Sequence, residues 1–153
     1  MDREAGLFSA RLSQIGIVVR DAERAGAMLS ALLGIGPFVF MTPGFREANY
    51  QGRRASFRAK LGFADAGPVQ IELVQPLEGS STWQEFLSVH GEGIHHIGFD
   101  VSDLTAALET AREEGIGVIQ SGRTEGGSHW AYLDTVEKVG VIVELMQRPT
   151  TNT

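Results

Sequence analysis

Two glutamates stand in the middle of short apolar stretches, where an ionised carboxylate is an unusual residue. Glu72 lies within VQIELVQ at 69–75, and Glu144 lies within VIVELMQ at 141–147. Both stretches have the length and the apolar content of a β-strand. Burying a carboxylate there costs free energy unless a partner compensates its charge. A bound cation is one such partner, and water on a half-exposed sheet is the alternative.

Gln14 and His96 occupy matching places in a second repeated sequence. Residues 14–25, QIGIVVRDAERA, align without gaps on residues 96–107, HIGFDVSDLTAA. An amide, an imidazole and two carboxylates together suit a divalent ion such as zinc, nickel, cobalt, manganese or magnesium. The chain has no cysteine, which excludes thiolate ligands, thiolate nucleophiles and disulfides. For His96 the alternative is a hydrogen-bonded histidine in an apolar core.

The alternation of side chains along a strand separates these four residues from their apolar neighbours. Adjacent side chains of a strand face opposite ways, so each candidate ligand points away from the apolar residues directly beside it. Gly16 and Gly98 share the face of Gln14 and His96, where they leave open space. We expect His95 on the opposite face, packed beneath a helix.

The repeats also predict the elements that position these residues. Each unit begins with a strand that leads into a helix, for which Asp21 and Asp103 are the expected N-caps. Two strands should follow each helix, GPFVFMTP and RRASFRAKLGF in the first unit and GVIQSGR and SHWAYLDT in the second, each pair separated by glycine-containing turns. We therefore predict an α+β protein of two βαβββ modules, residues 11–76 and 93–147, joined by a helical linker at 77–92.

Composition limits the classes of partner. The 153 residues are 42% apolar and 21% charged, which is typical of a packed globular domain. The formal charge of −6 argues against nucleic-acid binding. The first residues lack the apolar core of a signal peptide, and no apolar run is long enough to span a bilayer, so we expect a cytoplasmic protein without membrane contact.

Five of the thirteen basic residues fall between positions 46 and 60. They are Arg46, Arg53, Arg54, Arg58 and Lys60. Such a stretch is able to hold a phosphate or a carboxylate, although the alternative is a solvated outer face of a strand pair. An anionic substrate is therefore compatible with an acidic chain.

With this repeat and these candidate ligands, the chain resembles the vicinal oxygen chelate superfamily. That superfamily includes glyoxalase I, methylmalonyl-CoA epimerase, extradiol dioxygenases and bleomycin-resistance proteins. The likeness covers roughly residues 11–147 and is most specific to the epimerases in IELVQPLEGSSTWQEFL, GEGIHHIGFDVSDLTAALETAREEGI and GVIVEL. It implies a glyoxalase-like fold, an open, cupped mixed sheet around one divalent metal, and a homodimer. The ligands that it implies, on the first and last strand of each module, are Gln14, Glu72, His96 and Glu144.

Two features depart from the epimerase pattern. The first ligand is usually histidine in those epimerases but is Gln14 here, which resembles the Gln, Glu, His, Glu set of eukaryotic glyoxalase I. The epimerases also carry an acid/base glutamate before a Gln-Gly pair. Here Tyr50 precedes Gln51 and Gly52. Tyr50 or the nearby Glu47 would have to supply the second proton-transfer group.

The resemblance implies a metal-dependent isomerase or epimerase that moves a proton next to a carbonyl group through an enolate. Glu144, or Glu72 by symmetry, would carry the proton, and the substrate would be a small carbonyl acid or thioester. The side chains expected to line its pocket are Arg53, Arg54, His129 and Trp130. Lactoylglutathione lyase chemistry and noncatalytic binding, as in a resistance protein, are the alternatives. Gln14 argues against an extradiol dioxygenase, whose iron needs two histidines and a carboxylate.

Overall fold

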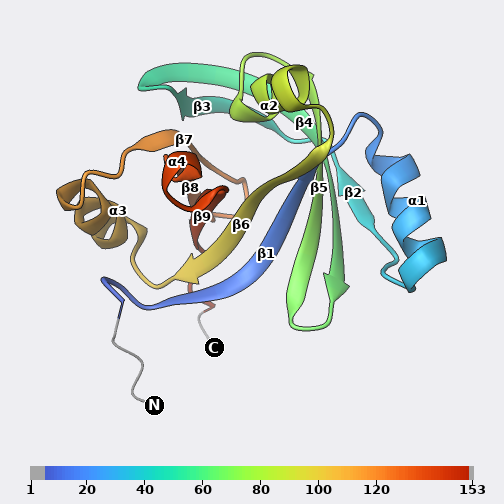
Figure 1. The fold of residues 1–153 in the computed structure, drawn as a ribbon, viewed down its shortest axis with the longest axis horizontal. Helices are drawn as coiled ribbons and strands as arrows, with labels where there is room; N and C mark the ends of the chain where they lie inside the picture. Colours follow the sequence, from blue (N-terminus) through green and yellow to red (C-terminus); the bar gives the residue numbers. More distant parts are fainter. Residues whose placement is uncertain (1–5, 152–153) are drawn as a thin grey trace.

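A computed structural model describes residues 6–151, whose nine strands form one mixed sheet (Figure 1). The strands are β1 (Ala10–Val18), β2 (Val39–Met41), β3 (Gly44–Tyr50), β4 (Arg53–Ala66), β5 (Val69–Glu78), β6 (Gly93–Val101), β7 (Val118–Arg123), β8 (His129–Leu133) and β9 (Ile142–Gln147). The helices are α1 (Ala22–Leu33), α2 (Thr82–His90), α3 (Leu104–Glu113) and α4 (Val136–Val139). Within residues 6–151, none of these helices has the length and apolar character needed to cross a membrane.

The sheet closes on itself, which corrects the expectation of an open cup. The strand order is β2-β4-β3-β7-β8-β9-β6-β1-β5. Because β5 also pairs with β4, the eight strands other than β2 form a closed ring. Strand β2 pairs with β4 outside this ring. The two halves of the chain are joined by the β1–β6 pairing and, across the ring, by a second seam, the β3–β7 pairing of Asn49 with Ser121 and of Tyr50 with Gln120. Backbone groups that an open cup would leave at free edges therefore find partners across the seam. The α+β class and the mixed sheet are as predicted.

Residues 44–50 form β3, although the sequence predicted a turn between two strands there. Phe45 and Ala48 are buried while Arg46 and Glu47 are exposed. The pairing register of β3 with β4 shifts between Phe45 and Ala48. This irregularity places two polar residues in succession, so the stretch lacks the strict alternation by which a strand is recognised.

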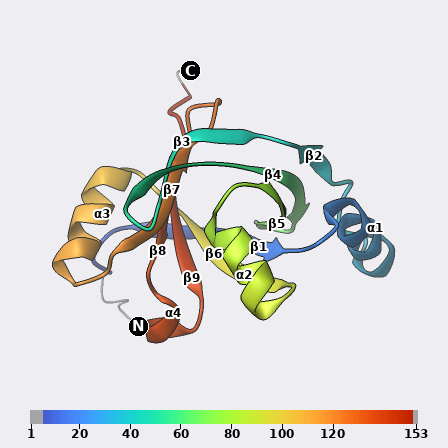
Figure 2. The same ribbon diagram turned by 90° about the horizontal axis from the view of Figure 1, so that it is seen from above.

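The predicted helix caps are confirmed in both halves. The carboxylate of Asp21 accepts a hydrogen bond from the backbone N–H of Arg24 at 3.0 Å, and Asp103 accepts one from Ala106 at 3.0 Å. These caps satisfy N–H groups that the first helical turn leaves free. They fix the points at which α1 and α3 leave the strands β1 and β6. The two helices lie on opposite flanks of the molecule (Figures 1 and 2).

An aromatic core fills the ring of strands. Trp83 comes from α2, the helix in the predicted linker, and is 2% exposed. It packs against Phe45, Phe57, Trp130 and Tyr132 with ring centroids 5.3–6.2 Å apart. Its indole N–H also donates to the hydroxyl of Tyr132 at 3.0 Å. The segment between the two halves is thus part of the interior and contributes to the wall of the central cavity.

Candidate metal centre

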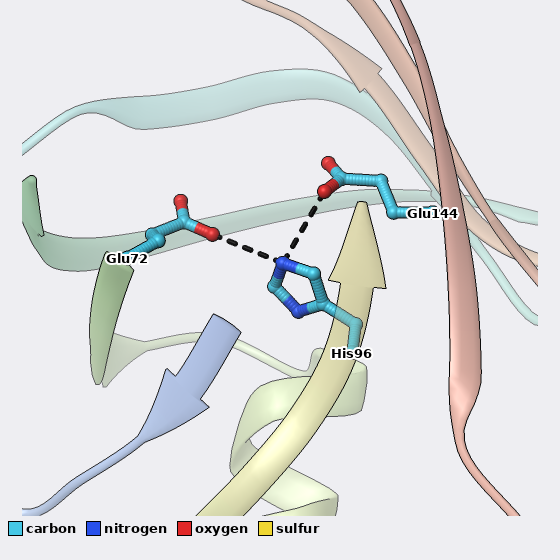
Figure 3. Close-up of side chains that lie close together, drawn as sticks. All are labelled: Glu72, His96 and Glu144. Atoms are coloured by element: carbon cyan, nitrogen blue, oxygen red, sulfur yellow. Dashed lines mark ion pairs between the residues drawn. The ribbon is translucent and has the colours of Figure 1, made fainter. Parts of the chain in front are cut away.

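Four side chains from four adjacent strands meet in the interior of the ring. They are Gln14 of β1, Glu72 of β5, His96 of β6 and Glu144 of β9, which are 2%, 7%, 0% and 3% exposed. Figure 3 shows the carboxylates of Glu72 and Glu144 approaching the same ring nitrogen of His96 from two sides. Their Oε2 atoms lie 3.1 and 3.2 Å from His96 Nε2.

The amide of Gln14 completes this cluster. One of its two terminal atoms lies 3.0 Å from Glu144 Oε2, 3.1 Å from Glu72 Oε2 and 3.3 Å from His96 Nε2, and the other lies 3.0 Å from Gln70 Oε1. With the nitrogen turned inward, the amide donates to both carboxylates in the metal-free protein. With the oxygen turned inward, the amide offers a cation a fourth ligand beside the two carboxylates and His96 Nε2.

The spacing of the four donor atoms fits a small divalent ion. Bonds of about 2.0–2.2 Å, such as zinc and magnesium form, separate neighbouring ligand atoms by roughly 2.8–3.6 Å. The contacts of His96 Nε2 and of the Gln14 amide within the cluster are 3.0–3.3 Å long, and the ligand atoms of Glu72 and Glu144 lie within 4.8 Å of each other. Calcium, with bonds of about 2.3–2.6 Å, prefers wider spacing and more oxygen ligands.

Two glycines make the cluster possible, but the space beside them is filled by ligand side chains and is not open as the sequence predicted. A Cβ atom on Gly16 would lie 1.9 Å from Cε1 of His96. A Cβ atom on Gly98 would lie 2.9 Å from Oε2 of Glu144 and 3.1 Å from Cβ of Gln14. Each glycine therefore makes room for ligands on neighbouring strands, so that the two halves shape each other's donors.

The cluster retains a proton when no cation compensates it. Burial by itself lowers the pKa of His96, but the charges and hydrogen bonds of Glu144 and Glu72 outweigh burial and raise the pKa to about 9. Burial raises the pKa of Glu144, an effect that His96 opposes. A metal ion would take the place of the proton on His96, because the ion binds the same lone pair.

His95 lies beside His96 rather than on the opposite face, which corrects the expectation from strand alternation. Gly16 of β1 pairs with His96, whereas Ile17 pairs with Ile94, so His95 is the extra residue of a β-bulge. The ring packs against Phe86 of helix α2, as a helix-covered position should. Burial, followed by the charge of His96, lowers the pKa of His95 to about 2.

Tyr50 and Glu47 lie elsewhere, because their strand turns them away from the cluster. The hydroxyl of Tyr50 donates to Glu85 of α2, and burial together with Glu85 raises the pKa of Tyr50 to about 12. Glu47 is exposed and accepts a hydrogen bond from Arg54 at 2.9 Å. Neither Tyr50 nor Glu47 is among the described residues that line the cavity with Glu144.

The residues predicted for the substrate pocket are divided in the same way. Trp130 is buried and lines the cavity of the cluster. Arg53 and Arg54 are exposed at the start of β4, and neither borders that cavity. His129 begins β8 and is half-buried outside the cavity wall. Of this group only Trp130 joins the four clustered residues.

The cluster opens into a cavity of about 240 Å³ that borders a larger groove of about 1040 Å³. Phe45 and Thr124 line both spaces. The charged side chains along the groove are Arg46, Glu47, Arg58, Glu78, Arg123 and Glu125. Arg148, which directly follows β9, lines the cavity itself and was not among the residues predicted from the sequence.

Comparison with known proteins places the chain among relatives of the same fold. It is 30% identical over 141 residues to an ethylmalonyl-CoA/methylmalonyl-CoA epimerase of Cereibacter sphaeroides, covering 90% of this chain and 97% of the relative. It is 29% identical over 139 residues to the uncharacterized protein YqjC of Bacillus subtilis, covering 90% of this chain and 91% of that protein. A variant of Streptomyces coelicolor methylmalonyl-CoA epimerase, solved in complex with 2-nitronate-propionyl-CoA, superposes with a TM-score of 0.71 at 26% identity. That likeness covers 94% of this chain and 97% of the solved one.

A family model matches residues 13–133, which span the first half of the chain and all of the second half except its last helix and strand. The matched part includes Gln14, Glu72 and His96. The chain belongs to the Glyoxalase/Bleomycin resistance protein/Dioxygenase superfamily.

Proposed function

We propose that this protein is a metal-dependent epimerase of a small acyl-CoA thioester, which moves a proton on the carbon next to the thioester carbonyl. The observation that carries the proposal is the convergence of four buried donor atoms beside a cavity. The epimerases among its relatives and structural neighbours support the reaction class.

Gln14, Glu72, His96 and Glu144 would hold the metal. A divalent ion bound there supplies positive charge that stabilises an oxygen on which negative charge develops. The side chains of the protein do the remaining work. Their burial excludes water, and the low polarity of the interior strengthens each charge–charge interaction.

Glu144 and Glu72 are the groups best placed to move the proton. In Figure 3 the two carboxylates flank His96, and each turns one oxygen toward the ring nitrogen. Inversion at carbon requires a proton to leave one face and to return to the other, for which two opposed carboxylates are suited. Burial raises the pKa of Glu144, which brings this carboxyl group nearer to the pH at which acid and base forms are both accessible.

The charged residues around the cavity suit an anionic substrate. Arg148 lines the cavity and is held through its Nε–H, which donates to Asp100 Oδ1 at 3.1 Å. A guanidinium fixed in this way can present its remaining N–H groups to a carboxylate. Arg46 and Arg123 line the adjoining groove together with Glu47 and Glu125, and these two arginines would be the partners for phosphates of a CoA group. We therefore place the acyl end in the cavity and the CoA end in the groove.

The test is proton exchange in heavy water. Protein loaded with cobalt(II) or zinc should incorporate deuterium at C2 of methylmalonyl-CoA and interconvert its epimers, as followed by NMR and mass spectrometry. Removing the metal with a chelator should abolish both signals. Loaded protein that exchanges neither methylmalonyl-CoA nor ethylmalonyl-CoA would refute the proposal.

Substitution of each carboxylate in turn tests which glutamate serves which face of the inverted carbon. Glu144→Gln should slow deuterium exchange by about 10²–10⁴-fold, since a positioned acid/base group contributes that much. Glu72→Gln should impair inversion more than exchange, because Glu144 would still remove and return the proton on one face. Glu113→Gln is the matched control, because Glu113 is exposed on α3 and lines neither the cavity nor the groove.

Gln14 supports one second candidate, an isomerisation of the lactoylglutathione lyase type. Its amide lies 3.3 Å from His96 Nε2, so the converging side chains are those of a Gln, Glu, His, Glu set. The hemithioacetal of methylglyoxal and glutathione is the substrate that separates the candidates. Turnover of this compound without exchange of acyl-CoA thioesters would favour the lyase.

A further inference from the structure

His95 and His96 meet in an unusual way for sequence neighbours in a strand. The β-bulge at His95 brings its Nδ1 to 2.9 Å from Nδ1 of His96. Both rings are fully enclosed, with exposures of 1% and 0%. A contact of this length between two ring nitrogens is a hydrogen bond, so one of them carries a hydrogen and the other accepts it.

The surroundings of His96 indicate which nitrogen is the donor. Its Nε2 faces the carboxylate oxygens of Glu72 and Glu144 and the amide of Gln14. When that nitrogen gives its lone pair to a metal, the only ring hydrogen of neutral His96 is on Nδ1. His95 Nδ1 is then the acceptor, and the Nε2–H of His95 is directed at Thr82 Oγ1, 3.3 Å away.

The far end of this chain of hydrogen bonds is anchored. Thr82 is the first residue of α2, and its backbone N–H donates to Gln120 Oε1 of β7 at 2.8 Å. Phe86 and Tyr132 enclose the His95 ring with centroid distances of 5.2 and 5.3 Å. His95 is therefore held in place by groups outside the metal cluster.

From this geometry we propose that His95 is a positioning residue, which keeps the hydrogen of His96 on Nδ1 and so leaves Nε2 free for the metal. The role rests on the proposed metal site. A partner of this kind fixes the tautomer and the orientation of a ligating histidine and makes its lone pair a stronger ligand. Neither of the two donor residues in the first half has a histidine partner of this kind, and the amide of Gln14 contacts the amide of Gln70 instead.

Two variants of His95 test this role. His95→Phe keeps a ring of similar size but removes the acceptor, and we expect the affinity for cobalt(II) to fall by about 10–100-fold. His95→Asn places an oxygen near the position of Nδ1 and should restore the affinity to within about threefold of the unaltered protein. His90→Phe is the matched control, because His90 also contacts Phe86 but is exposed and remote from His96.

A second measurement is independent of any substitution. Imidazole ¹⁵N spectra of the zinc-loaded protein should show a hydrogen on Nδ1 of His96 and none on Nδ1 of His95. Thermal unfolding of each variant without metal identifies any variant that is not folded. A hydrogen on His95 Nδ1, or a folded His95→Phe variant whose cobalt affinity stays within about twofold of the unaltered protein, would overturn the inference.

These outcomes separate this inference from the proposed function. If the unaltered chain binds cobalt and His95→Phe binds it equally well, only the role of His95 fails. If His95→Phe weakens cobalt binding but the loaded protein exchanges no thioester proton, only the proposed reaction fails. An unaltered chain that binds no cobalt refutes both.

Discussion

The first half of the chain, β1–β5, and the second half, β6–β9, place their ligands at matching positions but surround them differently. Gln14 and His96 lie on the paired central strands, and Glu72 and Glu144 lie on the strands outside them. In the first half the ligand from β1 is a neutral amide. In the second half it is an imidazole with a proton-sharing neighbour. The two halves thus place a ligand at the same position of the repeat, but the chemical type of that ligand differs between them.

The helices show the same contrast. The second half packs α3 against its strands through Leu104, Ala107 and Ala111, all of which are buried. The first half buries only Ala22 and Gly26 of α1, while Leu32 and Leu33 are exposed among the described residues. Similar backbones therefore support a tighter core in the second half, where His95, His96 and Tyr132 are also located. We expect loss of His96, the ligand of β6, to have a larger effect than loss of Gln14, its counterpart in β1.

Removal of the His96 imidazole should have the largest effect on metal binding and on stability. His96→Ala leaves two buried carboxylates facing an uncharged amide, and we expect it to abolish cobalt binding and to lower the free energy of unfolding of the metal-free protein by roughly 3–5 kcal/mol. Gln14→Ala, its counterpart in the first half, should cost roughly 1–3 kcal/mol because it removes only hydrogen bonds. Urea unfolding and metal competition measure both. Equal losses for the two variants would contradict the asymmetry.

The two glycines test the comparison at a smaller scale. Gly16→Ala drives a methyl group into the enclosed His96 ring, at 1.9 Å from Cε1, and should cost roughly 1–3 kcal/mol of stability. Gly98→Ala approaches the end of the Glu144 side chain at 2.9 Å, which can move more easily, and should cost less. Gly117→Ala, with open space around it, is the control. A larger loss for Gly98→Ala in urea unfolding would show that Glu144 is the more rigid ligand.

The pH dependence tests the proton that His96 holds in the metal-free protein. The pKa of His96 is raised to about 9 in the metal-free protein, above its ordinary value of 6.5. The proton of His96 therefore stabilises the fold below about pH 6.5, and this contribution is lost as the pH rises through about 9. Metal binding displaces the same proton, so the affinity for zinc should rise about tenfold per pH unit up to that value. Zinc affinity that is flat between pH 6.5 and 9 would show that His96 is not a ligand.

Much of this arrangement was predictable because the repeat and the period of a strand both survive in the sequence. Alternation places Glu72 and Glu144 on the interior face, and Gly16 and Gly98 mark the space that the ligands need. The caps at Asp21 and Asp103 follow from local hydrogen bonding and were equally visible. These features depend on neighbouring residues, which a single sequence contains.

The remainder depends on how distant strands meet. The ring closes through two residue pairs between β3 and β7. No local sequence pattern predicts which residues pair there. The position of Tyr50 follows from its contact with Glu85, thirty-five residues away. His95 does not follow the alternation of side chains in β6, because the β-bulge opposite β1 inserts one extra residue into β6 only. Long-range register thus decided the features that the sequence left open.

The segment that contains helix α2 links the two halves of the chain and so affects how the four ligands come together. Each half of the chain supplies only two of the four donors, so neither could enclose an ion alone. If the halves were separate polypeptides, the site would form only by their encounter. A short covalent tether replaces that encounter with an effective concentration on the order of millimolar. Because Trp83 of this tether is itself buried in the ring, the connection also contributes to the wall that it helps to bring together.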